Sequence, residues 1–149
     1  MPRVQALVCR DGKILMAKHR EGDRVYWCLP GGALEEGETP AEGALRELGE
    51  EACVEGRILR QTGCGLDHQG RNDVYTYLVD IGDQEPRLGH DPEVGRDEII
   101  LEDIVWLELR EIPERDRAFM WNSGLMNAPG MVEEVSAWGD DISYPGEST

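Results

Sequence analysis

The sequence predicts an α/β (α+β) fold in which helices cover a mixed β-sheet. Two observations support this prediction: β-type runs lie on both sides of one well-marked helix, and helical spacing of apolar residues returns only late in the chain. Strands, one helix, more strands and then helices are typical of a sheet that packs against helices. The chain has 149 residues, of which 40% are hydrophobic, enough for one domain with its own core.

The N-terminal part of the chain is expected to be a hairpin that leads into a glycine-rich loop. Residues 4–9 are apolar on both faces, as in a central strand, and Asp11-Gly12 is a hairpin turn signal. The partner strand is therefore expected over residues 13–18. A polar loop over residues 19–24 and a short extended piece over residues 25–29 should follow, ending at the glycine-rich loop Pro30-Gly31-Gly32.

Residues 40–52 carry the signals of an amphipathic helix. Thr39 is a good N-cap, Pro40 suits the first helical position, and Glu42 completes a capping box with Thr39. Apolar residues at helical spacing form one stripe that would face a core: Ala41, Ala44, Leu45, Leu48 and Ala52. One helix directly after the glycine-rich loop is therefore expected.

Strands and loops follow this helix before the chain becomes helical again. Strands are expected over residues 56–64, 74–79 and 98–109, and loops over residues 65–72 and 82–97. The second loop is long and rich in Gly, Pro and acidic residues, and such loops are often functional. Helical segments are expected over residues 115–126 and 131–138. The domain would then span residues 1–138, and residues 139–149 would be a loose tail.

The charge of the chain limits its partners. A formal net charge of −16 disfavours nucleic acid polymers and anionic membranes, and it would repel a phosphorylated substrate unless metal ions or local Arg and Lys reverse the field. The sequence has no charged-then-apolar leader and no apolar run long enough to span a bilayer, so we expect a cytoplasmic protein. The cysteines form no C-x-x-C pair and are expected to be free and mostly buried thiols: Cys9, Cys28, Cys53 and Cys64.

Three carboxylates on the predicted helix are not explained by stability. At about 100° per residue, Glu47, Glu50 and Glu51 fall on one side of the helix, beside the apolar stripe. Each like-charged pair costs a few tenths of a kcal/mol, and the helix dipole disfavours anions in the second half of a helix. Mg²⁺ and Mn²⁺ prefer carboxylate oxygens, so a bound cation would offset the repulsion. The alternative is a solvated acidic face, but the carbonyls of Gly31 and Gly32 could add ligands.

The spacing of these residues resembles the Nudix box. The matching positions are Gly32, Glu38, Arg46-Glu47-Leu48, Glu50-Glu51 and Val54, and residues 27–31 are similar to the usual approach to the box. Cys53 stands where the family pattern has glycine, which affects the turn after the helix. The resemblance implies the Nudix fold, a mixed β-sheet sandwiched between α-helices. It also implies a metal-dependent hydrolase that cleaves a phosphoanhydride (pyrophosphate) bond, with a homodimer as a common assembly.

The resemblance implies a metal-binding role for the three glutamates. Glu47, Glu50 and Glu51 would bind one or more Mg²⁺ or Mn²⁺ ions. The carbonyl of Gly31 or Gly32 would be a further ligand. Glu50 and Glu51 would also belong to the catalytic centre.

Other acidic and basic residues would support this centre. By resemblance, Glu38 and Arg46 would pair and brace the loop against the helix. Nudix enzymes often use one more acidic residue from outside the box, as a ligand or a base. Glu98 is favoured because it borders the long loop, and Glu102 is the second candidate. An ordinary acidic surface residue is the alternative interpretation of each.

The candidates for substrate binding are Arg20, Arg24, Trp27 and His68. Arg binds oxyanions through its planar fork, so both arginines could contact phosphate. Solvated loop charges are the alternative. Trp27 could stack on a base, although the resemblance favours packing beside the box. His68 lies on a polar loop and could reach a substrate.

Together these observations predict a Mg²⁺- or Mn²⁺-dependent pyrophosphohydrolase that acts on a small phosphorylated nucleotide. No marker for ADP-ribose, diadenosine polyphosphates, coenzyme A or NADH is evident, so the substrate stays open among nucleoside triphosphates, dinucleoside polyphosphates and nucleotide sugars. One alternative is a Nudix-like binding or regulatory domain without turnover, against which the intact glutamates argue. Another is an acidic protein that binds metal structurally, which leaves Glu38 and Arg46 without a role.

Overall fold

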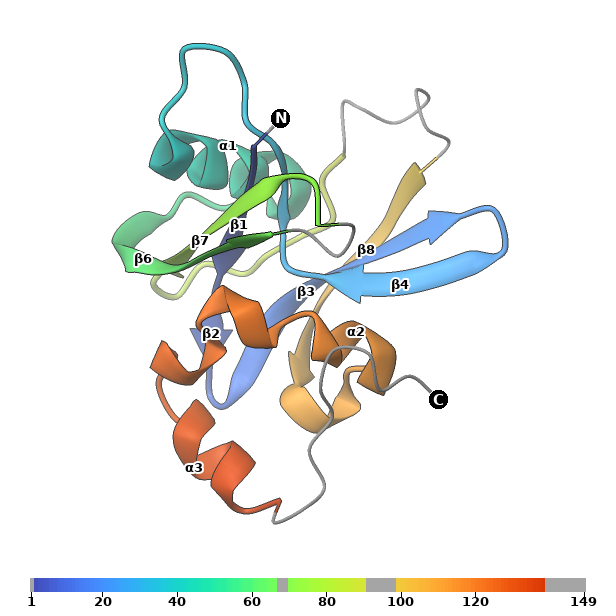
Figure 1. The fold of residues 1–149 in the computed structure, drawn as a ribbon, viewed down its shortest axis with the longest axis vertical. Coiled ribbons are helices and arrows are strands. Elements are labelled where there is room, and N and C mark those ends of the chain that lie inside the picture. Colours follow the sequence, from blue (N-terminus) through green and yellow to red (C-terminus); the bar gives the residue numbers. More distant parts are fainter. Residues whose placement is uncertain (1, 67–69, 91–98, 139–149) are drawn as a thin grey trace.

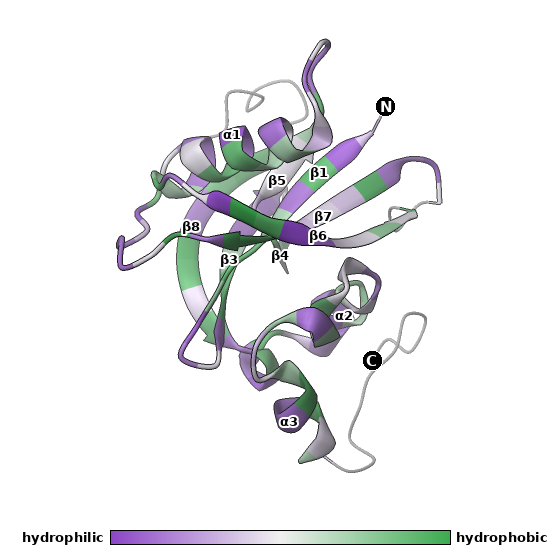
Figure 2. Ribbon diagram, turned by 90° about the vertical axis from the view of Figure 1, so that its left-hand side faces the viewer, coloured by the Kyte–Doolittle hydropathy of each residue, from purple (hydrophilic) through white to green (hydrophobic). Residues whose placement is uncertain are grey.

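The layers of the molecule follow the predicted α/β arrangement. The computed structural model describes residues 2–66, 70–90 and 99–138. In these residues the strands form two sheets, where the sequence predicted one. Helix α1 (Pro40–Ala52) covers the strands on one side, and the C-terminal helical segments cover them on the other (Figure 1, Figure 2). The predicted fold class, with strands between helices, is thereby confirmed.

The first sheet is mixed and has the strand order β5-β1-β7-β6. Its strands are β1 (Arg3–Leu7), β5 (Gly31–Ala33), β6 (Arg57–Leu66) and β7 (Asp73–Asp80). β1 runs parallel to β7 and antiparallel to β5, while β6 and β7 form an antiparallel pair. β1 is therefore a central strand, as its two apolar faces predicted: Val4 and Ala6 enter one core cluster and Leu7 enters another. The single strand predicted over residues 4–9 is wrong, however, because the chain passes to the other sheet at residues 9–10.

The second sheet is antiparallel and is built around strand β3 (Lys13–Glu21). This strand pairs with β2 (Cys9–Arg10), β4 (Arg24–Cys28) and β8 (Ile99–Glu108). Asp11 and Gly12 have φ values of 50° and 78° and join β2 to β3. Positive φ at both central residues is what a tight two-residue hairpin turn requires, so the predicted turn is confirmed.

Strand β3 is longer than the sequence predicted, so the prediction of a polar loop over residues 19–24 is wrong. Residues 19–21 pair with β4 on one side and with β8 on the other, and Gly22 and Asp23 form the turn between β3 and β4. Pairing on both edges satisfies the backbone N–H and C=O groups of this polar stretch. Polar side chains do not prevent such pairing. The polar composition of residues 19–24 was therefore a poor indicator of a loop.

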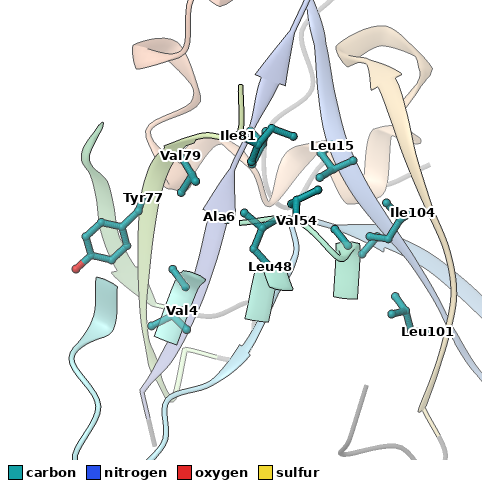
Figure 3. Close-up of a cluster of buried hydrophobic side chains, with 14 residues drawn as sticks. Val4, Ala6, Leu15, Leu48, Val54, Tyr77, Val79, Ile81, Leu101 and Ile104 are labelled. Carbon is teal, nitrogen blue, oxygen red and sulfur yellow. The ribbon is translucent and has the colours of Figure 1, made fainter. Parts of the chain in front are cut away.

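Helix α1 has the predicted bounds and packs against both sheets. Its capping box is complete: the Glu42 N–H donates to Thr39 Oγ1 at 3.2 Å, and the Thr39 N–H donates to the Glu42 carboxylate at 2.9 Å. Ala44, Leu48 and Ala52 are fully buried in the first core cluster. The strands and the segment after α1 contribute the rest of this cluster, much of which Figure 3 labels: Val4, Ala6, Leu15, Val54, Tyr77, Val79, Ile81, Leu101 and Ile104. This packing fixes the rotation of α1 and hence the direction of its carboxylates.

The C-terminal helical segments cover the other side of the strands. They are η1 (Leu109–Glu111), α2 (Glu114–Ala118), η2 (Trp121–Ser123), η3 (Leu125–Asn127) and α3 (Met131–Ser136). The prediction of one helix over residues 115–126 is wrong, because the chain turns at Gly124 with a φ of 78°. A Cβ at Gly124 would lie 2.0 Å from the carbonyl oxygen of Thr62, so this turn fits closely against β6. Buried residues of these segments form the second core cluster with Leu7, Ile14, Met16, Leu29 and Leu78.

The structure also bears on the expectations for membrane spans, for the cysteines and for the C-terminal tail. No helix in the described ranges is long and apolar enough to cross a membrane. The four cysteines are free thiols, as predicted, but the expectation that they are mostly buried is wrong, because Cys53 and Cys64 are exposed and Cys9 and Cys28 are half-buried. The tail over residues 139–149 lies outside the described residues, so the domain boundary at residue 138 stays a prediction.

Candidate active site

Glu51 is buried between α1 and the strands. Its side chain is 0% exposed. One carboxylate oxygen, Oε1, accepts a hydrogen bond of 2.9 Å from the backbone N–H of Gly31 at the start of β5. The other, Oε2, lies 3.7 Å from Nε2 of His19 on β3. The structure therefore brings the glycine-rich loop, the helix and the second sheet together at this carboxylate.

Glu47 lies one helical turn earlier and is also buried, at 4% exposure. Its carboxylate rests against Gly32: a Cβ at that position would be 2.5 Å from Oε1 of Glu47. Burial raises the pKa of Glu47 to about 7, and the neighbouring charges of Glu51 and Glu50 add to this effect, whereas Arg46 opposes it. A carboxyl group in this environment gains from a nearby cation.

Arg46 connects the helix to the loop before it. Nε and Nη2 donate to the two carboxylate oxygens of Glu38 at 2.7 and 3.0 Å, and Nη2 also donates to the carbonyl of Ala33 at 3.0 Å. Nη1 lies 2.9 Å from Oε1 of Glu47 and 3.3 Å from Oε2 of Glu50. The pairing with Glu38 is bidentate, and it lowers the pKa of that carboxyl. Nη1 also lies 3.6 Å from Oε1 of Glu35, so one guanidinium group contacts four carboxylates.

The three glutamates have donor chemistry that suits a hard divalent cation. Carboxylate oxygens are the preferred ligands of Mg²⁺ and Mn²⁺, and Glu47, Glu50 and Glu51 supply six of them within two turns of α1. In the described part of the chain, no three His, Cys, Asp or Glu side chains converge as a finished metal cluster. Between Glu47 and Glu50 the positive charge comes instead from Arg46. The carboxylate oxygens suit a divalent cation as ligands. The Arg46 guanidinium lies at the place between Glu47 and Glu50 where the positive charge of that cation would act.

A segment of the predicted long loop holds the end of α1. The backbone N–H groups of Arg87, Gly89 and His90 donate to the carbonyls of Ala52, Glu51 and Glu50, each at 2.9 Å. These carbonyls have no partner within a helix, because the last four carbonyls of any helix lack one. We call residues 87–90 the capping segment. It fixes the backbone of the residues that carry two of the three carboxylates.

Arg20, the substrate-binding candidate on β3, points away from Glu51. Successive side chains of a strand point to opposite faces, and His19 faces Glu51, so Arg20 points to the other side. There Arg20 and Lys18 form ion pairs with Glu102. The Glu102 carboxyl is thereby engaged on this far face, and Arg20 lowers its pKa.

The remaining candidate residues are Trp27 and Arg24 on β4, together with Glu98 and His68. Trp27 packs against the second core cluster, and its backbone N–H donates to Asp116 at 3.0 Å. Packing, which the resemblance favoured for this residue, is therefore what the structure shows. The guanidinium of Arg24 lies 4.8 Å from the ring centroid of Tyr26. Glu98 and His68 lie outside the described residues.

Sequence reasoning did not identify His19 and its surroundings. The ring of His19 stacks on Tyr26 at a centroid distance of 5.5 Å, and its Nδ1 lies 3.3 Å from Sγ of Cys28. Burial lowers the pKa of His19, but the neighbouring thiol of Cys28 and carboxylate of Glu51 outweigh burial and raise it. The signal was present in the sequence, because His19 is in phase with Leu15 and Ala17 on the core face of β3. His19 was not recognised as a core-facing residue because the strand was predicted to end at residue 18.

Comparisons with known proteins agree with this geometry. The chain matches the family model of the NUDIX domain over residues 1–126. It is 30% identical over 115 residues to the putative mutator protein MutT4 of Mycobacterium tuberculosis, and this match covers 71% of this chain and 43% of that protein. It is 39% identical over 70 residues to the RNA pyrophosphohydrolase of Gluconobacter oxydans, and this match covers 46% of this chain and 41% of that protein. The chain thus spans less than half the length of these curated relatives.

Solved structures show the same architecture. A MutT NUDIX hydrolase from Burkholderia pseudomallei is 28% identical with a TM-score of 0.57, and the match covers 76% of this chain and 88% of that one. A NUDIX hydrolase from Nitrosomonas europaea is 19% identical with a TM-score of 0.61, covering 99% and 95% of the two chains. The second likeness concerns the fold alone.

Proposed function

Because the chain belongs to the NUDIX family, we propose that it is a Mg²⁺- or Mn²⁺-dependent pyrophosphohydrolase. The bond cleaved would be a phosphoanhydride in a nucleoside triphosphate or in a nucleoside diphosphate derivative. The names of similar proteins support the reaction class: one is an RNA pyrophosphohydrolase, and others are diphosphoinositol polyphosphate phosphohydrolases. Their substrates differ from one another, so the proposal extends to the bond and not to one molecule.

The observation that carries this proposal is a pair of buried carboxylates on one helix, next to further acids. Glu47 and Glu51 are buried, and the Arg46 guanidinium that contacts Glu47 is shared with three other acids: Glu35, Glu38 and Glu50. Removing a charge from water costs several kcal/mol unless an opposite charge compensates for it. A divalent cation held by Glu47, Glu50 and Glu51 would supply that compensation. This is the reason to prefer a metal-binding centre to a solvated acidic face.

Each residue would contribute to one part of the reaction. A bound divalent cation would neutralise phosphate oxygens and lower the pKa of the attacking water. Glu50 and Glu51 would hold it at the end of α1, with the backbone of Gly31 beside them. Glu38 would keep Arg46 on the loop side of the helix. Glu98 is proposed as the acidic residue from outside the box, because Glu102 is engaged by Arg20.

The net charge supports a small substrate. With a formal charge of −16, the surface disfavours a polyanion such as nucleic acid, whereas one nucleotide presents a few phosphates that a bound cation can neutralise. A cytoplasmic location and a homodimer stay predictions of this proposal.

A substrate panel with and without metal tests the proposal. Nucleoside triphosphates, dinucleoside polyphosphates and nucleotide sugars would be incubated with Mg²⁺, Mn²⁺ or EDTA, and the released phosphate, pyrophosphate and nucleoside monophosphate measured. Metal-dependent release from at least one compound is expected. A protein that binds Mn²⁺ yet releases no product from any compound would instead be a nucleotide-binding or regulatory domain without turnover.

The variant Glu51→Gln should remove most of this activity. It keeps the size of the side chain but removes a charge at the buried ligand position, so kcat should fall by roughly 100-fold or more while the protein stays folded. Glu55→Gln is a matched control, because Glu55 is exposed just beyond the helix. Full activity in Glu51→Gln would contradict the assignment of Glu51 as a ligand.

A further inference from the structure

The side chain of His19 lies between a free thiol and the carboxylate of Glu51. Its Nδ1 is 3.3 Å from Sγ of Cys28, and its Nε2 is 3.7 Å from Oε2 of Glu51. The imidazole is buried at 6% exposure, and one of its faces stacks on Tyr26. Both nitrogens and the ring plane are therefore in contact with the protein, which leaves the imidazole little freedom to rotate.

The contact with His19 completes the surroundings of the Glu51 carboxylate. Oε1 accepts a hydrogen bond from the Gly31 N–H, which fixes one end of the group from the loop. Nε2 of His19 lies 3.7 Å from Oε2 on the β3 side, which is the distance of an ion pair and longer than a hydrogen bond. A carboxylate held at Oε1 and approached at Oε2 by an imidazole has a restricted orientation. Groups that orient a metal ligand in this way change metal affinity or activity by about 10- to 100-fold when they are removed.

The sequence register makes this contact possible. His19 pairs with Tyr26 across β3 and β4, and Ala17 pairs with Cys28, so the histidine and the cysteine lie on the same face of the sheet. The same face carries Leu101, which pairs with His19 from β8. An ordinary core position on this face would hold an apolar residue, because Leu15, Ala17 and Leu101 all belong to the first core cluster.

We propose that His19 is a positioning residue of the active site. Its Nε2 sets the orientation of the Glu51 carboxylate, and the contact of Nδ1 with Cys28 holds the imidazole in place for that purpose. The proposal rests on the metal-dependent function proposed above and adds a residue outside the box to its machinery. It distinguishes His19 from Arg20, its neighbour in sequence, which points to the opposite face and contacts Glu102.

Two amide variants distinguish two possible roles of His19: orienting the Glu51 carboxylate, or only filling space in the core. In His19→Gln the amide nitrogen can reach the place of Nε2 and contact Glu51, whereas in His19→Asn it reaches the place of Nδ1, on the Cys28 side. His19→Phe keeps a flat ring that can stack on Tyr26 but has no nitrogen. Tyr26→Phe is the control, since it keeps the stacked ring and both contacts of His19.

Binding of Mn²⁺ without substrate, followed by electron paramagnetic resonance, is the first measurement. We expect His19→Phe and His19→Asn to weaken Mn²⁺ binding about tenfold, whereas His19→Gln and Tyr26→Phe stay within about threefold of the wild type. The second measurement is steady-state kinetics on a substrate found in the panel. The same two variants should lower kcat about tenfold or more with little change in KM, since the altered group does not contact the nucleotide.

The outcomes are distinct. Wild-type Mn²⁺ affinity and kcat in a folded His19→Phe variant would overturn the positioning role. Equal losses in His19→Gln and His19→Asn would also overturn it, because a role limited to packing predicts no difference between the two amides. If His19→Phe does not fold, the two amide variants still decide. If the wild type binds Mn²⁺ but hydrolyses nothing, the proposed function fails, and the Mn²⁺ affinities alone test the role of His19.

Discussion

At the scale of single residues, the site depends on close contacts between backbone and carboxylate. Gly31 donates its N–H to Glu51, and Gly32 leaves room for the carboxylate of Glu47. Both glycines therefore act through the glutamates they touch. The resemblance implied that a carbonyl of Gly31 or Gly32 would act with the glutamates, whereas the contact in the structure is a hydrogen bond from the Gly31 N–H. The box could not predict His19, because a contact between β3 and α1 is not visible in the local sequence of either element.

Gly32→Ala should damage the site more than the fold. The three atoms nearest to a new Cβ all belong to the Glu47 carboxylate, at 2.5 to 2.9 Å, and this flexible side chain can move away. We expect a stability loss of about 1 kcal/mol or less, but a fall in kcat of about 10- to 100-fold, because a displaced catalytic group loses its geometry. Chemical denaturation and initial rates would measure the two effects.

Gly49→Ala is the matched control for this variant. Gly49 is exposed on the same helix, and a Cβ there would meet its nearest neighbour at an ordinary 3.7 Å. Alanine is favoured over glycine in a helix by about 1 kcal/mol, so this variant should be more stable and fully active. A Gly32→Ala enzyme with full activity would show that Glu47 need not occupy its observed position.

Cys53 carries a conformation that suits glycine. It follows the last residue of α1 with φ 58° and ψ 37°, in the left-handed region, and its N–H donates to the carbonyl of Gly49. A residue with a Cβ is disfavoured there by roughly 1 kcal/mol. Cys53→Gly should therefore raise the free energy of unfolding by up to about 1 kcal/mol. Cys53→Ala, which also removes the thiol but keeps a Cβ, should leave stability nearly unchanged, and equal gains in both variants would point to the thiol instead.

At the scale of elements, α1 was predictable because its signals are local. Thr39, Pro40 and Glu42 mark its start within one turn, and its apolar stripe is contained in its own sequence. The end of β3 depends on partners in β4 and β8, and β8 begins at Ile99, far along the chain. The break at Gly124 was hidden for a different reason: apolar residues continue at near-helical spacing through it, while the turn is set by contact with Thr62.

The capping segment over residues 87–90 is an element that local sequence did not reveal. Gly89 is central to it, because a Cβ there would lie 1.9 Å from the carbonyl oxygen of Glu50. Gly89→Ala should separate this segment from the helix end, at a cost of about 1–3 kcal/mol, and should weaken Mn²⁺ binding. Thermal denaturation and Mn²⁺ titration would measure both effects.

Leu88→Ala is the control for the capping segment. Leu88 is 46% exposed, and its substitution leaves the three backbone hydrogen bonds to α1 in place. We expect little change in melting temperature or Mn²⁺ affinity. Unchanged Mn²⁺ binding in a destabilised Gly89→Ala variant would mean that the segment supports the fold without supporting the site.

At the scale of the whole molecule, charge and metal binding are linked. The chain carries a net charge of −16, and two of its carboxylates are buried beside α1. A cation that binds the folded state and not the unfolded chain stabilises the fold by RT ln(1 + [L]/Kd), which is about 2.7 kcal/mol at one hundred times Kd. Mn²⁺ should thus raise the melting temperature by several degrees, and EDTA should reverse this effect.

The double variant Glu47→Gln/Glu51→Gln provides the comparison for this shift. It lacks the two buried charges, so Mn²⁺ should no longer raise its melting temperature. Ca²⁺ and added NaCl would serve as controls for a general effect of ionic strength. An equal shift in wild type and variant would place the stabilising cations elsewhere on the acidic surface.

The position of Arg46 has a kinetic consequence. Its guanidinium lies between Glu47 and Glu50 and is tied to Glu38 by a bidentate pair. A cation that binds Glu47 and Glu50 would have to displace Nη1 of Arg46 from both carboxylates, while the pair with Glu38 would hold the arginine on the loop. The rate of metal binding would then depend on how fast the two contacts of Nη1 break.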